Sequence, residues 1–197
     1  MAQSSLNQAA ARARLLDDRP QGPGPVVYWM HREHRASDNW ALILAQQLAL
    51  DAGAPLAVVH CLAPAYGEAC LRQYGFLVRG LVETAETLRA LGVPLVQLQG
   101  DPGVELPRFL AEHQAGALVT DFDPARLKQD WLHRVLPASQ VRTWEADSRN
   151  VVPAWLASDR KEHMARTFRP RLRGKLPDFL EQPPKLLRHP QAWPGDP

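Results

Sequence analysis

The stretch PQGPGPVVYWM, residues 20–30, sets a cluster of Pro and Gly directly before five β-branched, aromatic and apolar residues. Pro and Gly interrupt regular structure, and a short apolar run behind such a cluster is typical of a strand buried on both faces. We therefore expect the folded domain to begin near residue 23, with its first strand over residues 26–30. Residues 1–22 are predicted to form an N-terminal arm.

Four more apolar runs follow this strand, and helical patterns separate them. The runs are PLAVVHCL (55–62), VPLVQLQ (93–99), ALVTDF (117–122) and VRTWEA (141–146). None shows the strict in-and-out alternation of a strand with one exposed face, so helices should cover both faces of the sheet. The sequence predicts an open five-stranded parallel α/β sheet of Rossmann-like type over residues 23–153, with right-handed crossovers.

Beyond residue 153 the pattern changes, and residues 154–197 are predicted to be a basic, Pro-rich linker or tail. Residues 159–175 hold seven Lys and Arg against two Asp and Glu, a net charge of +5, so the remainder of the chain carries −3. Two interpretations are open for this segment. It is either a solvated arginine-rich helix or linker, or a surface for nucleic acid or an acidic partner domain.

The composition excludes several classes of protein. With 197 residues, 45% hydrophobic and 22% charged, the chain is neither fibrous nor wholly disordered. The longest apolar stretch, residues 40–50, is interrupted by two Gln and is too short to span a bilayer, so we expect no membrane association. The presence of only two cysteines, Cys61 and Cys70, fits a reducing compartment and suggests a cytoplasmic location.

Ligands of parallel α/β sheets bind outside the carboxyl ends of the strands, so the loops there are the candidate sites. The motifs GxGxxG, GxxxxGK[ST] and GxSxG are all absent. His31, Glu33 and His34 are metal-ligand types in the first such loop, but no second ligand cluster accompanies them, so we predict no metal site. His60 lies within a strand and is interpreted as a core histidine. No catalytic residue is predicted.

Five longer motifs occur in one order along the chain. They are YWMHREHRASDNWAL (28–42), RQYGFLVRGL (72–81), ALVTDFDP (117–124), NVVPAWLASDRKEHMARTFRP (150–170) and KLPDFL (175–180). In this order they resemble the amino-terminal half of class II cyclobutane pyrimidine dimer photolyases, the deoxyribodipyrimidine photo-lyases. The resemblance runs from about residue 12 to about residue 182, nearly the whole chain.

The resemblance implies an antenna-type domain associated with light-dependent repair of pyrimidine dimers. In this family the α/β domain of many members bears an antenna chromophore, 8-hydroxy-5-deazaflavin or a folate. A helical domain holds FAD and receives the flipped-out dimer. We expect that FAD-binding helical domain to be absent from this chain, which alone should neither hold FAD nor split dimers. Its expected partner is a helical FAD-binding domain or subunit, through which it would meet DNA only indirectly.

Two motifs of the family carry over by position, R-x-x-R-x-x-D-N onto residues 32–39 and T-D-F-x-P onto residues 120–124. With neighbouring apolar walls they give the predicted cofactor-binding set: Trp29, Met30, Arg32, Arg35, Asp38, Asn39, Leu62, Thr120, Asp121, Phe122 and Leu127. A structural interpretation is equally open. In it Asp38 caps the following helix, Arg35 pairs with Asp38 or Asp121, and no ligand is present.

Departures from the family pattern limit this carry-over. The family usually has Asp and Gln where this chain has Glu33 and His34. It also usually has Asp-Ala-His-Asn before its Val-Val-Pro, whereas this chain has Asp147, Ser148, Arg149 and Asn150, so Arg149 replaces the family's histidine. An inherited role for that histidine is therefore in doubt. An alternative function is a stand-alone small-molecule or nucleotide-binding module, or a docking subunit, without repair activity.

Overall fold

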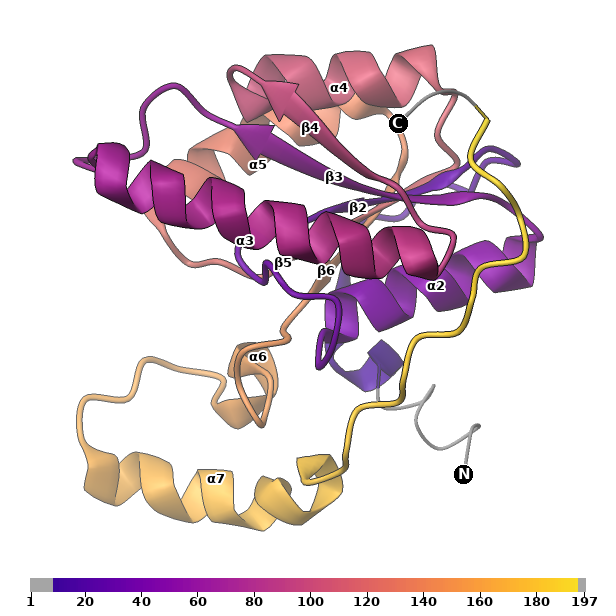
Figure 1. Cartoon of the computed structure of the whole chain (residues 1–197). Helices are drawn as coiled ribbons and strands as arrows, with labels where there is room; N and C mark the ends of the chain where they lie inside the picture. The colour runs from indigo at the N-terminus through magenta and orange to yellow at the C-terminus, as the bar shows by residue number, and fades with distance from the viewer. Residues whose placement is uncertain (1–8, 195–197) are drawn as a thin grey trace.

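The computed structural model describes residues 9–194, and its centre is one six-stranded sheet (Figure 1). In space the strands follow the order β1-β6-β5-β2-β3-β4. All neighbouring pairs are parallel except β1 with β6. The strands, with the labels of Figure 1, are β1 (Ala13–Asp17), β2 (Val26–Trp29), β3 (Leu56–Leu62), β4 (Leu95–Gln99), β5 (Ala117–Asp121) and β6 (Arg142–Ala146).

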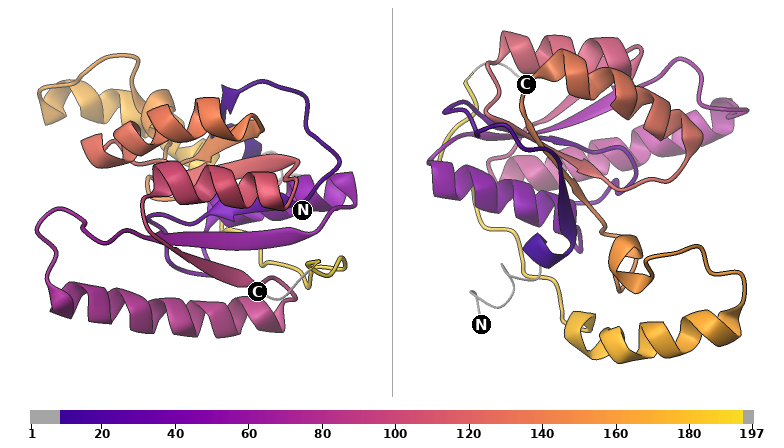
Figure 2. Two further views of the ribbon diagram at one scale, coloured as in Figure 1. Left: turned by 90° about the horizontal axis from the view of Figure 1, so that it is seen from above. Right: turned by 180° about the vertical axis from the view of Figure 1, so that it is seen from behind.

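Helices cover both faces of the sheet, as the apolar runs predicted (Figures 1 and 2). They are α2 (Trp40–Ala52), α3 (Leu71–Ala90), α4 (Pro102–Glu112) and α5 (Arg126–Ser139). Successive residues of β2 point to opposite faces, so Tyr28 joins the core beneath α2 and α3, whereas Trp29 joins the core beneath α4 and α5. All four residues of β2 are buried. The α/β fold is confirmed.

The prediction of five strands was wrong by one, because β1 forms inside the predicted N-terminal arm. Ala13 and Leu15 pair with Ala146 and Trp144 of β6 in antiparallel register. The sequence of β1, ARLLD, lacks the apolar run that marks the other strands, because it is an edge strand with partly exposed residues. Its Arg14 reaches across to the buried Glu145, with 2.6 Å between Nη2 and Oε2.

The chain after β6 forms two helices and then returns across the domain. The short α6 (Ala154–Ala157) and α7 (Ala165–Phe179) project away from the sheet (Figure 1). Arg12 fixes the end of α7, since its guanidinium donates to the carbonyl oxygens of Phe179 and Asn150, each at 2.9 Å. Farther on, the side chain of Gln46 bonds both backbone groups of Leu187. The predicted tail is therefore packed onto the domain along part of its length.

The cluster of Pro and Gly before β2, residues 20–25, lets two loops approach each other closely at Gly24. A Cβ placed on Gly24 would lie 1.8 Å from the carbonyl oxygen of Gln114. Gly116 lies equally close, because its Cβ would meet the carbonyl oxygen of Gly22 at 2.4 Å. The two loops at the amino ends of β2 and β5 therefore touch backbone to backbone, and only Gly fits there.

We predict that Gly24→Ala lowers the free energy of unfolding by about 2–3 kcal/mol, because the loops must separate to admit the methyl group. Urea unfolding followed by circular dichroism measures this. Gly80→Ala, within α3 and facing open space, is the control and should gain about 0.5–1 kcal/mol from helix propensity. Equal effects of the two substitutions would contradict the close approach.

Candidate functional site

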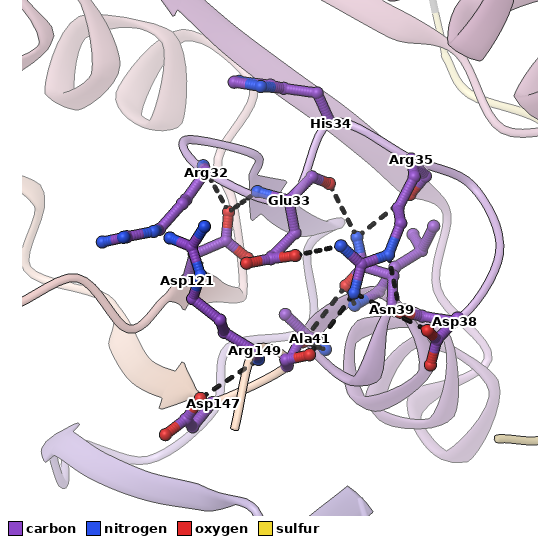
Figure 3. A network of polar contacts seen from close by, with 12 residues as sticks. Arg32, Glu33, His34, Arg35, Asp38, Asn39, Ala41, Asp121, Asp147 and Arg149 are labelled. Carbon is purple, nitrogen blue, oxygen red and sulfur yellow. Dashed lines mark hydrogen bonds and ion pairs between the residues drawn. The ribbon is translucent and has the colours of Figure 1, made fainter. Parts of the chain in front are cut away.

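The carboxylate of Asp121, the last residue of β5, organises the loop that follows β2. Its Oδ2 accepts hydrogen bonds from the backbone N–H groups of His31, Arg32 and Glu33 at 2.9, 2.8 and 3.1 Å. Its Oδ1 accepts the hydroxyl proton of Tyr28 at 2.6 Å. Figure 3 shows Asp121 beside the backbone of this loop. One buried carboxylate thus ties the carboxyl ends of β5 and β2 together.

This carboxylate occupies the place where the order of the strands reverses. The chain runs from β2 to β3 and β4 on one side, and returns to β5 and β6 on the other. A crevice between β2 and β5 is where the fold predicts a ligand. In this protein the carboxylate of Asp121 accepts the hydrogen bonds of the loop amides in that crevice. Desolvation and the adjacent charge of Asp121 raise the pKa of Tyr28 well above its ordinary value, so its hydroxyl stays a proton donor.

Asn39, and not Asp38, caps α2, which corrects one expectation. The Oδ1 of Asn39 accepts the backbone N–H of Leu42 at 3.0 Å, and its Nδ2 donates to the carbonyl oxygens of Glu33 and Arg35. Asp38 adopts a left-handed backbone with φ of 50°, and its side chain is 68% exposed. The cap falls one residue later because Asn39 has the extended backbone that an N-cap requires.

Arg35 is engaged within the same loop (Figure 3). Its guanidinium forms an ion pair with the buried Glu33, donates to the carbonyl oxygen of Asp38 at 2.9 Å, and approaches the Asp38 carboxylate at 3.9 Å. It also donates to the carbonyl oxygen of Ser148 in the loop after β6. Through these contacts Arg35, Asp38 and Asn39 stabilise the loop to which they belong. Their role as chromophore contacts stays a prediction.

A cavity of about 350 Å³ lies next to this network, at the carboxyl end of β3. Its walls come from the loop after β2, the end of β3, the start of α3 and the start of α5. The lining residues are His31, Arg32, His34, His60, Cys61, Leu62, Ala63, Tyr66, Tyr74, Leu77, Asp123, Ala125 and Trp131. The volume suits a ligand of a few fused rings.

Three aromatic rings surround one part of the cavity. The ring of His31 lies edge-on to Trp131, with 5.4 Å between centroids, and 6.1 Å from the ring of Tyr66. Tyr66 and Trp131 are 6.2 Å apart. Trp131 is buried, whereas Tyr66 is 43% exposed at the mouth. Such an arrangement offers flat apolar surfaces to a planar molecule.

Polar groups also line the cavity, and Asp123 orders two of them. Although burial works against its charge, hydrogen bonds from His31 and from the Ala125 amide and the charge of Arg32 lower the pKa of Asp123 to about 2. The carboxylate is therefore ionised at neutral pH and holds His31 at 3.4 Å and Arg32 at 2.5 Å. Arg32 remains about one-third exposed at the cavity rim.

Two further histidines line the cavity, and each has one buried ring nitrogen without a partner in the described part of the chain. His34 and His60 lie edge to face, with 5.0 Å between ring centroids. Burial lowers the pKa of both, that of His60 to about 3, with the neighbouring His34 and His31 contributing. Within residues 9–194 the buried His34 Nε2 and His60 Nδ1 have no hydrogen-bond partner. Each neutral imidazole can donate one hydrogen bond and accept another, so the pair could bind a polar ring edge.

Lys128 lies fully buried beneath the cavity. Its ammonium donates to Thr120 Oγ1 at 2.6 Å and sits 3.1 Å from the centroid of the Trp29 ring. Desolvation lowers the pKa of Lys128 to about 7, although Asp121 and Glu145 favour its charged form. Burial raises the pKa of the Cys61 thiol to about 12, so this cysteine is protonated and is not a nucleophile at neutral pH. Trp29 and Thr120 therefore contact Lys128 below the cavity.

The predicted site residues separate into four places. Arg32 and Leu62 line the cavity, and Trp29 and Thr120 lie below it. The loop network holds Arg35, Asp38, Asn39 and Asp121. Three predicted apolar walls lie elsewhere: Met30 in the core beneath α2, Leu127 against the core beneath α5, and Phe122 edge-on to Trp155.

Most of the lining could not be predicted from the sequence, because its members come from distant segments of the chain. Tyr66 and Trp131 are 65 positions apart, and no spacing rule joins them. His60 was interpreted as a core histidine. It is buried in β3, as that interpretation requires, but within residues 9–194 its Nδ1 has no hydrogen-bond partner, and the residue lines the cavity. One signal was present, because His31, His34 and His60 all stand at or near strand carboxyl ends.

Two absences concern residues 9–194, the part of the chain that the structure describes. No group of three or more His, Cys, Asp or Glu residues in this part of the chain is arranged to hold a metal ion. None of the helices described there combines the length and the apolar character that crossing a bilayer requires.

Comparison with known proteins relates this arrangement to one family. Residues 26–190 match the model of the family described as DNA photolyase. The chain is 43% identical over 188 residues to a deoxyribodipyrimidine photo-lyase of Potorous tridactylus, covering 92% of this chain and 35% of that protein. It is 42% identical over 201 residues to one of Arabidopsis thaliana, covering 98% and 40%. The chain therefore spans well under half the length of these curated relatives.

Solved structures share the fold at lower identity. The chain is similar to a cryptochrome of Synechocystis, with a TM-score of 0.65 and 18% identity over 88% of this chain and 37% of that one. It is also similar to a bacterial class III photolyase of Agrobacterium tumefaciens, with a TM-score of 0.64 and 22% identity over 91% and 38%. These likenesses support the Rossmann-like α/β fold.

We predict that Asp121→Asn lowers the free energy of unfolding by about 3 kcal/mol or more, because an amide cannot replace a charged acceptor of three backbone N–H groups and a hydroxyl. Urea unfolding at neutral pH measures the change. Asp38→Asn, in the same loop but exposed, should change the free energy by less than about 0.5 kcal/mol. Indistinguishable midpoints for the two variants would refute the central role of Asp121.

The depressed pKa of His60 predicts how stability depends on pH. The unfolded chain takes up a proton near pH 6.5, whereas folded His60 takes one up only near pH 3, so its contribution to stability falls as pH drops through this window. The loss is at most about 1.4 kcal/mol for each pH unit. His60→Gln should flatten the profile measured by thermal unfolding from pH 6.5 to 4. The exposed His133→Gln is the control, and a profile for His60→Gln as steep as the control's would oppose this account.

Proposed function

The chain belongs to the DNA photolyase family, and from this membership we propose that it acts as the antenna-type α/β domain of a photolyase in light-dependent repair of pyrimidine dimers in DNA. The observation that carries the proposal is the cavity of about 350 Å³ at the carboxyl end of β3, with aromatic walls and unpaired imidazole nitrogens. A planar pigment needs both features.

We assign the chain to class II within the family. The assignment is supported by the motifs of residues 28–42 and 150–170, and by the T-D-F-x-P pattern that ends β5. The substitutions near Arg149 and at Glu33 and His34 are this chain's own features. His34 lines the cavity, so this difference falls where a ligand would be recognised.

The cavity residues fit the pigments proposed, 8-hydroxy-5-deazaflavin or a folate. Buried polar atoms normally have hydrogen-bond partners, whereas one ring nitrogen each of His34 and His60 has none within residues 9–194. Such a pigment, when bound, supplies absorption of light and passes the excitation energy to a flavin. Tyr66, His31 and Trp131 would hold its rings. His60 and His34 would bond its polar edge, and Arg32 at the rim would face an anionic substituent.

The flavin chemistry is proposed to reside in a helical FAD-binding domain or subunit. The chain covers 35% and 40% of the two photo-lyases named above, so most of the length of those proteins has no counterpart here. We propose that residues 150–180, with α6 and α7, connect the antenna domain to that partner. The partner holds the lesion and the FAD, and a cytoplasmic location is part of the same proposal.

We predict that purified protein binds 8-hydroxy-5-deazaflavin or a reduced folate saturably, with a shifted absorbance spectrum and quenched Trp fluorescence. Tyr66→Ala should weaken binding about tenfold, because a stacked aromatic pair contributes about 0.5–1.5 kcal/mol beyond its buried area. Tyr66→Phe should keep the affinity. FAD, titrated in parallel, should show no saturable binding.

Phe76→Ala is the matched control, because Phe76 is an exposed aromatic residue of α3 that does not line the cavity. Its affinity should equal that of the unaltered protein. Absence of saturable binding of either pigment, or a Tyr66→Ala variant that binds as tightly as the Phe76→Ala variant, would rule out an antenna function at this cavity.

A further inference from the structure

Helix α7 carries a row of arginines that the proposed function does not use. Arg166, Arg169 and Arg173 are all exposed, and together with Pro170 they line one shallow open hollow. Their spacing of three and then four residues places them along one side of the helix. At 1.5 Å for each residue, they rise about 4.5 Å and then about 6 Å along the axis. We call these three residues the α7 arginine row.

Three other basic residues of this segment already have partners. Arg160 pairs with Glu162 at 3.4 Å, and Arg171 pairs with Asp159 and Glu162, each at 3.2 Å. Lys175 donates to the carbonyl oxygen of Leu156. In contrast, none of the three arginines of the row has an ion pair or a hydrogen bond with any residue between 9 and 194. Their charges are therefore uncompensated locally.

The orientation of α7 leaves the row accessible. The apolar residues Phe168, Leu172 and Leu176 line a separate hollow of about 610 Å³ between α6 and α7. The arginine row lies on the adjoining side, and α7 stands away from the sheet in Figure 1 and in the right-hand view of Figure 2. No residue of α7 is buried, so the arginines contribute nothing to the core. An extended partner could reach all three at once.

We propose that the α7 arginine row binds the phosphate backbone of duplex DNA without reading its sequence. Guanidinium groups match phosphate geometry and are always charged. Only the three arginines and Pro170 line the hollow around the row, so this side of α7 offers no aromatic ring for stacking on a base. The apolar residues of α7 line the separate hollow against α6, so the row itself lacks the apolar anchors on which protein interfaces depend. Charge without apolar anchors favours a polyanionic backbone over an acidic protein surface.

This inference goes beyond the proposed function. In that proposal DNA meets the helical partner, whereas here the antenna domain makes a contact of its own, outside the lesion. The contact does not depend on pigment binding, so either proposal can fail without the other. Neutralising three phosphates gives a salt dependence with a slope of about −2.7 in log K against log[salt], which is about a 40-fold loss of affinity between 50 and 200 mM.

The test uses fluorescence anisotropy with the full chain and an undamaged, labelled 30-base-pair duplex, in a salt series. The chain should bind with the slope given above, whatever the duplex sequence. The triple variant Arg166→Gln/Arg169→Gln/Arg173→Gln should lose nearly all of that slope and bind at least tenfold more weakly at 50 mM salt. Circular dichroism and the urea midpoint should be unchanged, because the three side chains are exposed.

The matched control is Arg72→Gln/Arg79→Gln/Arg89→Gln on α3, which removes the same charge from three exposed arginines. It should keep the slope of the unaltered chain. A control that loses as much affinity as the α7 variant would show a general charge effect and overturn the proposal. So would a polyglutamate peptide that binds the α7 row more tightly than the duplex does, which would indicate an acidic protein partner instead.

Discussion

One buried carboxylate determines how the functional end of this domain is built. Asp121, at the end of β5, accepts three backbone N–H groups of the loop after β2 and the hydroxyl of Tyr28. A charged acceptor that satisfies so many buried donors is strongly favoured, because leaving those donors unpaired would be costly. The loop of residues 31–39 is therefore held in one conformation, from which Asn39 caps α2 and Arg35 reaches Glu33 and Ser148.

The same contact determines where open space remains at this end of the sheet. With the crevice between β2 and β5 taken by Asp121, open space remains at the carboxyl end of β3, where His31, Tyr66 and Trp131 form aromatic walls. The polar groups that line the cavity differ in their charge states. Asp123, with its pKa lowered to about 2, binds His31 and Arg32, whereas His34 and His60 stay neutral because burial disfavours their charged forms. The result is a site with flat apolar surfaces, neutral hydrogen-bonding groups and one cation at its rim.

The sequence predicted the layers of the fold, because apolar runs and Pro-Gly clusters are local signals, and it pointed to the end of the sheet at which the cavity lies. It did not predict β1, since ARLLD at an edge has no apolar run, and it placed the cap of α2 at Asp38 when the backbone selects Asn39. Most of all, it could not tell which polar side chains turn inward. Asp121 was expected among the ligand contacts, yet it bonds to the protein's own amides, because that choice depends on β2 and β5 being neighbours. Tyr66 and Trp131 meet only after α3, β4, α4 and β5 have been placed.

A crystal structure of the chain with bound 8-hydroxy-5-deazaflavin would test the central claim most directly, namely that Asp121 closes the crevice and leaves the cavity at β3 as the pigment site. The account predicts electron density for the pigment in the cavity, against Tyr66 and Trp131, with the carboxylate of Asp121 still bonded to the amides of His31, Arg32 and Glu33. Density over Arg35 and Asn39, with Asp121 withdrawn from those amides and turned to the pigment, would contradict it.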